Sequence, residues 1–290
     1  MKLLILSLLL PSLLMGQDFS KVQIKTIKIS KNIHMLQGAG GNIGVLSGND
    51  GVFIIDDQFA PLTKKIKAAI SKISRKPIKY VFNTHWHFDH TGGNENLGKS
   101  GTVIVAHENV RKLLSKDQML KVFGKELKAS PKVALPVITF NSRINFHLNN
   151  EHLSIFHVQN AHTNGDGIIH FKESNVFHMG DTFFKDKFPF IDVQHGGSLK
   201  GIILAAEKVL AMSNSKTQYI PGHGDLADYQ DLKNYVKTLK DVQLRLSKFK
   251  RNNTSLKRVL KKKPLEDLDK TYGSGFMKTD KWISIVYPTL

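Results

Sequence analysis

The stretch NTHWHFDHTGG, residues 83–93, holds three of the chain's 13 histidines within six positions. His85 and His87 are two residues apart, so on an extended backbone their side chains leave the same side and can reach one metal ion. Asp89 and His90 are adjacent, so their side chains diverge and can serve a neighbouring ion. A single ion on the first pair would leave Asp89 and His90 without a role. The stretch therefore indicates a metal site, and Asp89 and His90 are available to a second ion beside it.

A predicted strand–helix–strand unit precedes the histidines. Residues 51–57 (GVFIIDD) and 77–83 (PIKYVFN) are apolar runs typical of strands that are buried on both faces. Residues 61–74 between them have the periodicity of an amphipathic helix, with an apolar face of Leu62, Ile66, Ala69, Ile70 and Ile73. The histidines begin where the second strand ends, and ligands collect at that edge of an open α/β sheet.

The remainder of the chain repeats this organisation. Strands are predicted over 22–29, 32–38, 136–140, 143–148, 152–158, 167–171, 175–180 and 217–221, with Asn149-Asn150 as a hairpin turn. Helices are predicted over 198–212 and from about Asp225 to the late 240s. The Gly-rich stretch 38–44 lacks the spacing of a phosphate-binding loop, so we expect a flexible hairpin loop there. Hairpins followed by helices in both halves predict two sheets packed face to face with helices outside.

Composition is that of a globular protein, with 41% hydrophobic and 23% charged residues in 290. The chain has no cysteine, which removes thiolates from the possible metal ligands and nucleophiles and rules out a lipid anchor on cysteine.

Residues 1–16 (MKLLILSLLLPSLLMG) have the pattern of a secretory signal peptide, with one early lysine and then an apolar run. A retained membrane anchor is the alternative, disfavoured because Pro11 interrupts a run that is short for a span. We expect a periplasmic or secreted protein that has no membrane attachment once the signal is removed.

The formal net charge is +18, and residues 248–263 carry eight basic residues and no acidic ones. Such a run can form a patch for nucleic acid or for a membrane surface. It can equally be a solvated, lysine-rich helix face, which we favour because the run has a single aromatic residue, Phe249, and lacks the interleaved aromatic side chains of single-strand binders. We expect no nucleic-acid partner.

The motif HWHFDH is an H-x-H-x-D-H signature, and over about residues 22–245 the chain resembles the metallo-β-lactamase-fold hydrolases. Later family motifs match His162 in NAHTNGD, Asp181 in HMGDTFF and His223 in PGHGD. The resemblance implies a four-layer αββα sandwich with the metal site at the edge of the two sheets. It places the domain over residues 22–250, followed by a basic C-terminal extension, 251–290, whose Trp282, Ile285 and Tyr287 we expect to pack on the domain.

The resemblance also implies two zinc ions per chain. One would bind His85, His87 and His162, the other would bind Asp89, His90 and His223, and Asp181 would bridge them. A hydroxide held between the ions would attack a carbonyl carbon, with Asp89 orienting it as the catalytic residue.

Several residues near these motifs have two open interpretations. Asp56 in FIIDDQ matches the acidic residue that steadies the ligand loop, although it could instead cap the following helix. His195 follows Asp181 on a loop that could line the site. Lys185 and Lys187 could pair with a substrate carboxylate or be solvated. The histidines assigned to packing or surface roles are His34, His107, His147, His152, His157, His170 and His178.

The leading functional hypothesis is an exported dizinc hydrolase that cleaves a cyclic amide or ester of a small molecule, with β-lactams among the expected substrates. A lactonase, or another ester or thioester hydrolase of the same fold, is the alternative. A mononuclear iron oxygenase also stays open, because the resemblance includes family members that use the same motif for iron. An RNA-cleaving enzyme is disfavoured by the predicted export. A non-catalytic metal-binding module is disfavoured because no ligand of the set is missing.

Overall fold

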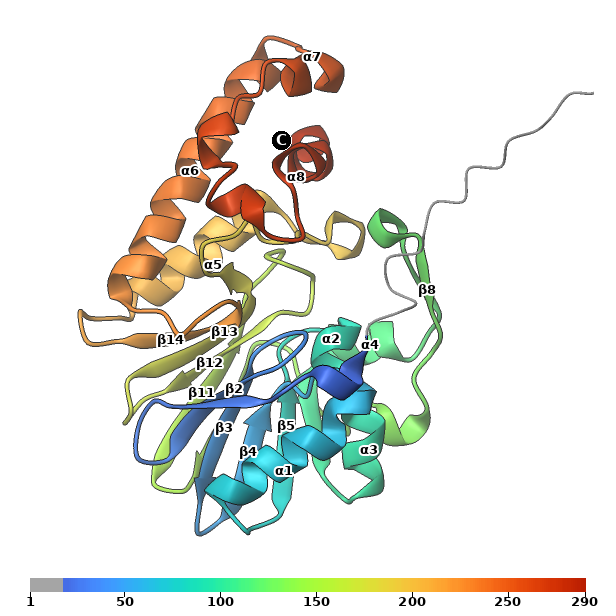
Figure 1. Ribbon diagram of the computed structural model, residues 1–290, viewed down its shortest axis with the longest axis vertical. Helices are drawn as coiled ribbons and strands as arrows, with labels where there is room; N and C mark the ends of the chain where they lie inside the picture. Colours follow the sequence, from blue (N-terminus) through green and yellow to red (C-terminus); the bar gives the residue numbers. More distant parts are fainter. Residues whose placement is uncertain (1–17) are drawn as a thin grey trace, which may run out of the picture.

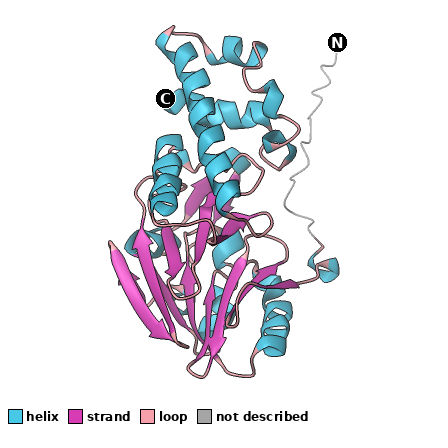
Figure 2. Ribbon diagram, turned by 90° about the vertical axis from the view of Figure 1, so that its left-hand side faces the viewer, coloured by secondary structure: helices cyan, strands magenta, loops and turns pink. Residues whose placement is uncertain are grey.

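Two β-sheets stack face to face at the centre of the molecule, and helices cover both outer faces (Figures 1 and 2). The computed structural model describes residues 18–290, so the predicted signal peptide, residues 1–16, lies outside the described part of the chain. The predicted αββα sandwich is confirmed. Within residues 18–290, no helix is both long and apolar enough to cross a membrane.

The first sheet has seven strands and begins with antiparallel hairpins, after which its strands run parallel. In spatial order the strands are β1 (Lys25–Lys28), β2 (Ile33–Gln37), β3 (Ile43–Gly48), β4 (Gly51–Ile55), β5 (Ile78–Asn83), β6 (Val103–His107) and β9 (Ile138–Phe140). The helices in this half are α1 (Thr63–Ile73), α2 (Phe88–Thr91), α3 (Asn94–Lys99) and α4 (Glu108–Leu114). The predicted strand–helix–strand unit is β4, α1 and β5, and β4 pairs with β5 in parallel.

The second sheet has five strands, of which only the last pair is parallel. They are β10 (Arg143–Leu148), β11 (Glu151–His157), β12 (Gly167–Phe171), β13 (Val176–Phe184) and β14 (Gln218–His223). Asn149 and Asn150 join β10 to β11 with φ of 56° and 58°, the left-handed conformation that a tight hairpin turn requires. The helices of this half are α5 (Leu199–Ala211) and α6 (Tyr229–Arg251).

Strand β4 shows how one strand joins two layers of the core. Phe53 and Ile55 lie in the cluster between the sheets, whereas Ile54 belongs to the cluster beneath α1 together with Ile66 and Ile70. All three strand residues are fully buried. Burial on both faces explains why this strand is a continuous apolar run.

Helix α6 begins at Tyr229, four residues later than predicted, because Asp228 caps it. The Asp228 side chain accepts a hydrogen bond from the backbone N–H of Asp231, and the Asp231 side chain accepts one from Asp228. This reciprocal pair satisfies donors that the first turn leaves free. The helix continues to Arg251, beyond the predicted end.

The C-terminal segment, which includes α7 (Leu256–Lys261) and α8 (Thr279–Val286), folds back onto the outer helices. Trp282 and Ile283 are fully buried in the cluster that also contains Ile202 of α5. The Trp282 indole N–H donates to the carbonyl of Pro189 at 2.7 Å. The segment is thereby attached to the chain that follows β13.

A short two-stranded hairpin, β7 (Gln118–Leu120) and β8 (Lys125–Leu127), stands apart from both sheets and was not predicted. The Gln194 side chain holds it in place, because its amide donates to the carbonyl of Met119 at 2.7 Å.

Candidate metal centre

The predicted ligands meet at one edge of the sandwich because the strands that carry them end there. Strand β5 ends at Asn83, so His85 and His87 follow on the short loop before α2, which then presents Asp89 and His90. Between the two histidines, Trp86 is buried in a cluster with Ala106 and Val110.

The other ligands come from the second sheet. His162 lies in the loop between β11 and β12, Asp181 lies within β13, and His223 is the last residue of β14. The register between β13 and β14 is irregular around Gly180, which has a φ of 50°. An irregularity of this kind changes the direction of the side chain that follows, here Asp181.

The first group of possible ligands is His85, His87, His162 and Asp181, whose donor atoms all lie within 4.8 Å of one another. His162 Nε2 is 2.9 Å from His87 Nδ1 and 3.5 Å from Asp181 Oδ2. His85 Nε2 is 3.8 Å from the same Asp181 oxygen.

The second group is Asp89, His90 and His223. His223 Nε2 lies 3.3 Å from Asp89 Oδ2 and 3.4 Å from His90 Nε2. The second Asp181 oxygen, Oδ1, is 3.1 Å from His90 Nε2 and 3.5 Å from His223 Nε2. The structure therefore brings all seven predicted residues together, with one oxygen of Asp181 facing each group.

The donor atoms fit metal ions. His85 Nε2 and Asp181 Oδ1 are buried and have no hydrogen-bond partner among the described residues. A buried polar atom without a partner is costly, and a cation at each ligand group would satisfy the atom that faces it. Imidazole nitrogens and carboxylate oxygens are ligands of zinc and also of iron.

The two groups differ in charge. Burial lowers the pKa of His162 to about 4 and holds that of His85 well below its usual value, so both rings are neutral and can donate lone pairs. Burial acts in the same direction on His223, but the Asp181 and Asp89 carboxylates outweigh it and raise the pKa of His223 to about 9. These carboxylates therefore attract positive charge into the second group.

A layer of hydrogen bonds behind the ligands fixes their orientation. Asp192 accepts from His87 Nε2 at 2.9 Å, which leaves His87 Nδ1 facing the first group. The carbonyl of Phe190 accepts from His162 Nδ1 at 2.7 Å. The Asp166 carboxylate accepts from the backbone N–H groups of His162 and Thr163 at 2.7 and 2.8 Å.

Asp56 steadies the ligand loop and does not cap a helix. Its carboxylate accepts from the backbone N–H of Thr84 at 2.7 Å, from the Thr84 hydroxyl at 2.8 Å, and from His90 Nδ1 at 2.7 Å. The side chain is fully buried, and the backbone is left-handed with a φ of 63°.

His195 lies behind the ligands. Its Nδ1 donates to the Asp192 oxygen that also accepts from His87, and its ring packs on Trp86. Of the two interpretations left open for His195, its contact with Asp192 supports a place behind the ligands.

The Gly-rich stretch is held against the ligands, contrary to the expected flexible loop. The backbone N–H of Gly41 donates to the carbonyl of Asp89, and a Cβ at Gly41 would lie only 2.1 Å from the His90 ring. The Asn42 side chain donates to the carbonyls of Pro221 and Gly224. Glycine is required here for close approach to the metal-ligand segment.

Lys185 is already paired, because its ammonium group lies 2.7 Å from the Asp231 carboxylate and 3.2 Å from the carbonyl of Leu226. The aliphatic part of the Lys187 side chain packs against Gly275. A different cation, Lys125 of β8, lies over the Phe88 ring at 3.6 Å and interacts with the charge of Asp89. The histidines assigned to packing or surface roles are absent from both ligand groups of the described chain.

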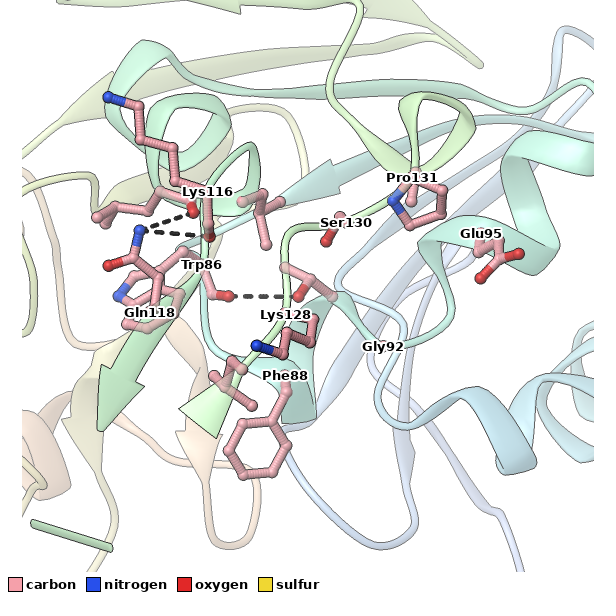
Figure 3. A pocket seen from close by; sticks show the side chains of 14 residues that line it. Trp86, Phe88, Gly92, Glu95, Lys116, Gln118, Lys128, Ser130 and Pro131 are labelled. Atoms are coloured by element: carbon pink, nitrogen blue, oxygen red, sulfur yellow. Dashed lines mark hydrogen bonds between the residues drawn. The ribbon is translucent and has the colours of Figure 1, made fainter. Parts of the chain in front are cut away.

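Figure 3 shows a cavity of about 180 Å³ behind the ligand loop, lined by Trp86 and Phe88, which alternate with the ligands along the chain. The carbonyl of Trp86 accepts from the Thr91 hydroxyl there. Solvent reaches the metal centre at Asp89 and His223, whose side chains are 21% and 20% exposed, while the other ligands are buried.

A family model described as the metallo-beta-lactamase superfamily matches residues 36–241. Among curated proteins, the chain is 27% identical over 205 residues to the probable metallo-hydrolase MJ0888 of Methanocaldococcus jannaschii, covering 69% of this chain and 90% of that protein. Two other relatives are matched only in part. The alkyl/aryl-sulfatase BDS1 of Saccharomyces cerevisiae is 32% identical over a match that covers 26% of this chain and 12% of that protein. The 2,4-dinitroanisole O-demethylase subunit alpha of a Nocardioides species is 23% identical over a match that covers 48% of this chain and 40% of that protein.

Solved structures share the fold. A metallo-beta-lactamase from Pontibacter korlensis superposes with a TM-score of 0.61 at 19% identity, covering 75% of this chain and 99% of that one. The DIM-1 metallo-beta-lactamase gives a TM-score of 0.61 at 19% identity, covering 77% of this chain and 100% of that one.

Proposed function

Because the chain belongs to the metallo-beta-lactamase superfamily, we propose that it is an exported, zinc-dependent hydrolase that opens a cyclic amide or ester of a small molecule. The observation that carries the proposal is the position of Asp181 between two groups of ligand atoms, with Oδ2 toward the first and Oδ1 toward the second. This arrangement suits two ions that share one carboxylate.

Zinc bound at both groups would supply Lewis-acid activation of a water molecule and of the scissile carbonyl at neutral pH. His85, His87 and His162 would hold the first ion. Asp89, His90 and His223 would hold the second, and Asp181 would contact both.

Asp89 has a second role as the residue that positions the attacking water. Its side chain lies on the solvent-exposed side of the centre. Burial raises its pKa, but the His90 and His223 side chains outweigh that effect and lower the pKa of Asp89 to about 2. The carboxylate is therefore a hydrogen-bond acceptor throughout the neutral range and can orient a water molecule beside the carbonyl carbon.

Water is the nucleophile that the site favours. The chain has no cysteine, and the Thr84 hydroxyl beside the ligands is fully buried and donates to Asp56. A buried hydroxyl that donates to a carboxylate cannot approach a substrate on the exposed side of Asp89 and His223.

The predicted signal peptide, residues 1–16, narrows the substrate class. Thioesters of glutathione or coenzyme A are cytosolic, whereas β-lactams and lactones reach the periplasm and the medium. Both of these classes present a ring carbonyl to the same attack, so the site chemistry leaves both as substrates. A lactonase is the alternative within this proposal.

The test uses purified mature protein, with metal content, nitrocefin turnover and aryl-lactone turnover measured on the same sample. His87→Ala should abolish hydrolysis and reduce bound metal, because it removes a ligand of the first group. The matched control is His152→Ala, since His152 lies on β11 outside both ligand groups and should change neither quantity.

The outcomes separate the candidate functions. Nitrocefin turnover with bound zinc supports a β-lactamase, and turnover of the lactone alone supports the lactonase. One iron ion per chain and hydrolysis of neither substrate would overturn the proposed hydrolase and favour an oxygenase. Equal losses in His87→Ala and His152→Ala would contradict the assignment of the ligands.

A further inference from the structure

Two segments outside the sandwich approach each other near the metal centre: the β7–β8 hairpin and the C-terminal residues 272–278. Figure 1 shows the C-terminal part of the chain, in red, passing above the edge of the sheets, opposite the green hairpin. The ring of Phe123 in the hairpin lies 6.5 Å from the ring of Phe276 in the C-terminal segment. Phe276 thus contributes to the surroundings of the centre from outside residues 36–241, the part that matches the family.

A row of aromatic rings connects Phe276 to the ligands. Phe184 stacks on His223 with ring centres 4.9 Å apart, and Phe276 is 6.5 Å from Phe184. On the hairpin side, Phe123 is 5.1 Å from Phe190, and Phe190 is 5.5 Å from His87. The rings of the row therefore contact ligands of both groups.

Phe276 is the exposed member of this row. It is 56% exposed, whereas Phe184 is fully buried and Phe190 is 5% exposed. A single exposed phenylalanine is ordinary on a protein surface, so its position is the informative feature. The buried Phe184 ring lies between it and His223, one of the two ligands that solvent reaches.

The backbone around Phe276 is anchored on both sides. Tyr272 packs on Phe188, whose backbone N–H donates to the Tyr272 carbonyl at 2.9 Å. Met277 is buried in the same cluster as Trp282. An exposed ring on an anchored segment is preorganised for contact with a ligand, because the backbone loses little conformational entropy on binding.

We propose that Phe276, with Phe123 beside it, binds an apolar group of the substrate, such as an acyl chain or an aryl substituent next to the scissile carbonyl. The C-terminal segment then sets the substrate range of the enzyme. This inference rests on the proposed function for the identity of the substrate. The contact itself requires only an apolar ligand on the exposed side of the centre.

Turnover gives the first test. The metal-loaded wild type and Phe276→Ala are compared on a γ-lactone with no side chain and on one with a six-carbon side chain. Loss of one aromatic contact should lower kcat/KM for the long lactone by about tenfold and leave the short one unchanged. Phe276→Leu, which keeps apolar area, should retain most of the preference. Leu244→Ala on α6, at a residue 52% exposed, is the matched control and should change neither.

Binding without turnover gives the second test. Octanoate and acetate are titrated into the holoenzyme by calorimetry, and octanoate should bind about tenfold more weakly to Phe276→Ala than to the wild type while acetate does not change. If no ester or amide is hydrolysed but octanoate binding depends on Phe276, the proposed function fails and this inference stands. If lactones are hydrolysed and Phe276→Ala changes kcat/KM equally for the short and the long lactone, the inference is overturned and the function stands. The same holds if Phe276→Ala changes kcat/KM for neither lactone.

Discussion

Asp192 shows how the arrangement of single residues supports the centre. One of its oxygens accepts hydrogen bonds from His87 at 2.9 Å and from His195 at 2.7 Å. Burial raises its pKa, but the two histidines outweigh burial and hold the pKa of this carboxyl below its usual range. Asp192 therefore stays ionised and fixes which nitrogen of His87 faces the first ligand group.

Substitution Asp192→Asn should weaken metal binding without removing a ligand. An amide accepts a weaker hydrogen bond from His87 and can present its NH2 group instead, so His87 loses its fixed orientation. We expect zinc affinity to fall by about 10- to 100-fold, measured by competition with a chromogenic chelator. Asp241→Asn, an exposed residue of α6 paired with Arg245, is the control. Unchanged affinity in Asp192→Asn would contradict the orienting role.

The seven ligand residues were predicted from the sequence, but Asp192 was missed for a physical reason. The ligands belong to short motifs whose residue types and order are informative on their own. Asp192 contacts His87 across 105 positions of the chain, and its own surroundings, DVQH, contain no signal of that contact. Lys125 was missed in the same way, because its hairpin reaches Phe88 only in the folded chain.

At the scale of elements, helix α6 depends on its cap. The reciprocal hydrogen bonds of Asp228 and Asp231 begin the helix, and Asp231 also pairs with Lys185, directly after β13. Burial of Leu232, Tyr235 and Leu239 then attaches the helix to the outer face of the second sheet. The start of α6 is thus coupled to the strand that carries Asp181.

Removing the cap with Asp228→Ala should lower the free energy of unfolding by about 0.5–2 kcal/mol, because the backbone N–H of Asp231 loses its acceptor. Urea denaturation followed by circular dichroism measures the change. Asp241→Ala breaks only a surface pair with Arg245 and should cost less than about 1 kcal/mol. A loss in Asp228→Ala no larger than in this control would show that the capping box contributes nothing.

The order and type of most elements could be predicted because periodicity and turn residues are local signals. The strand–helix–strand unit and the Asn149-Asn150 turn are confirmed. The β7–β8 hairpin was missed because its strands have three residues each, too few to show alternation. The beginning of α6 was predicted too early, since Asp225 and Asp228 are both acceptable capping residues by sequence and only the folded chain shows which one caps.

At the scale of the whole molecule, buried neutral histidines make stability depend on pH. His107 caps α4, because its Nδ1 accepts from the backbone N–H of Asn109 while Nε2–H donates to the carbonyl of Asn141. Burial, and next the charge of His157, lower the pKa of His107 to about 4 from 6.5. Between these two pH values the unfolded chain binds a proton at this position and the folded chain does not.

The free energy of unfolding of the wild type should therefore lose this contribution as the pH falls from 6.5 toward 4. In His107→Asn the amide retains a capping acceptor and cannot titrate, so the decrease should be shallower. Urea unfolding in a chelator, at several pH values in this window, measures the difference. His147→Asn at an exposed position is the control. Parallel pH profiles for the wild type and His107→Asn would contradict the assignment.

The most direct measurement is the metal content of the wild type, His85→Ala and His90→Ala, determined by native mass spectrometry and confirmed by elemental analysis. Each variant removes one ligand from a different group, while Asp181 remains between the groups. We expect two zinc ions in the wild type and about one in each variant. One ion in the wild type, or metal content that is unchanged in either variant, would contradict a centre built from two ligand groups that share Asp181.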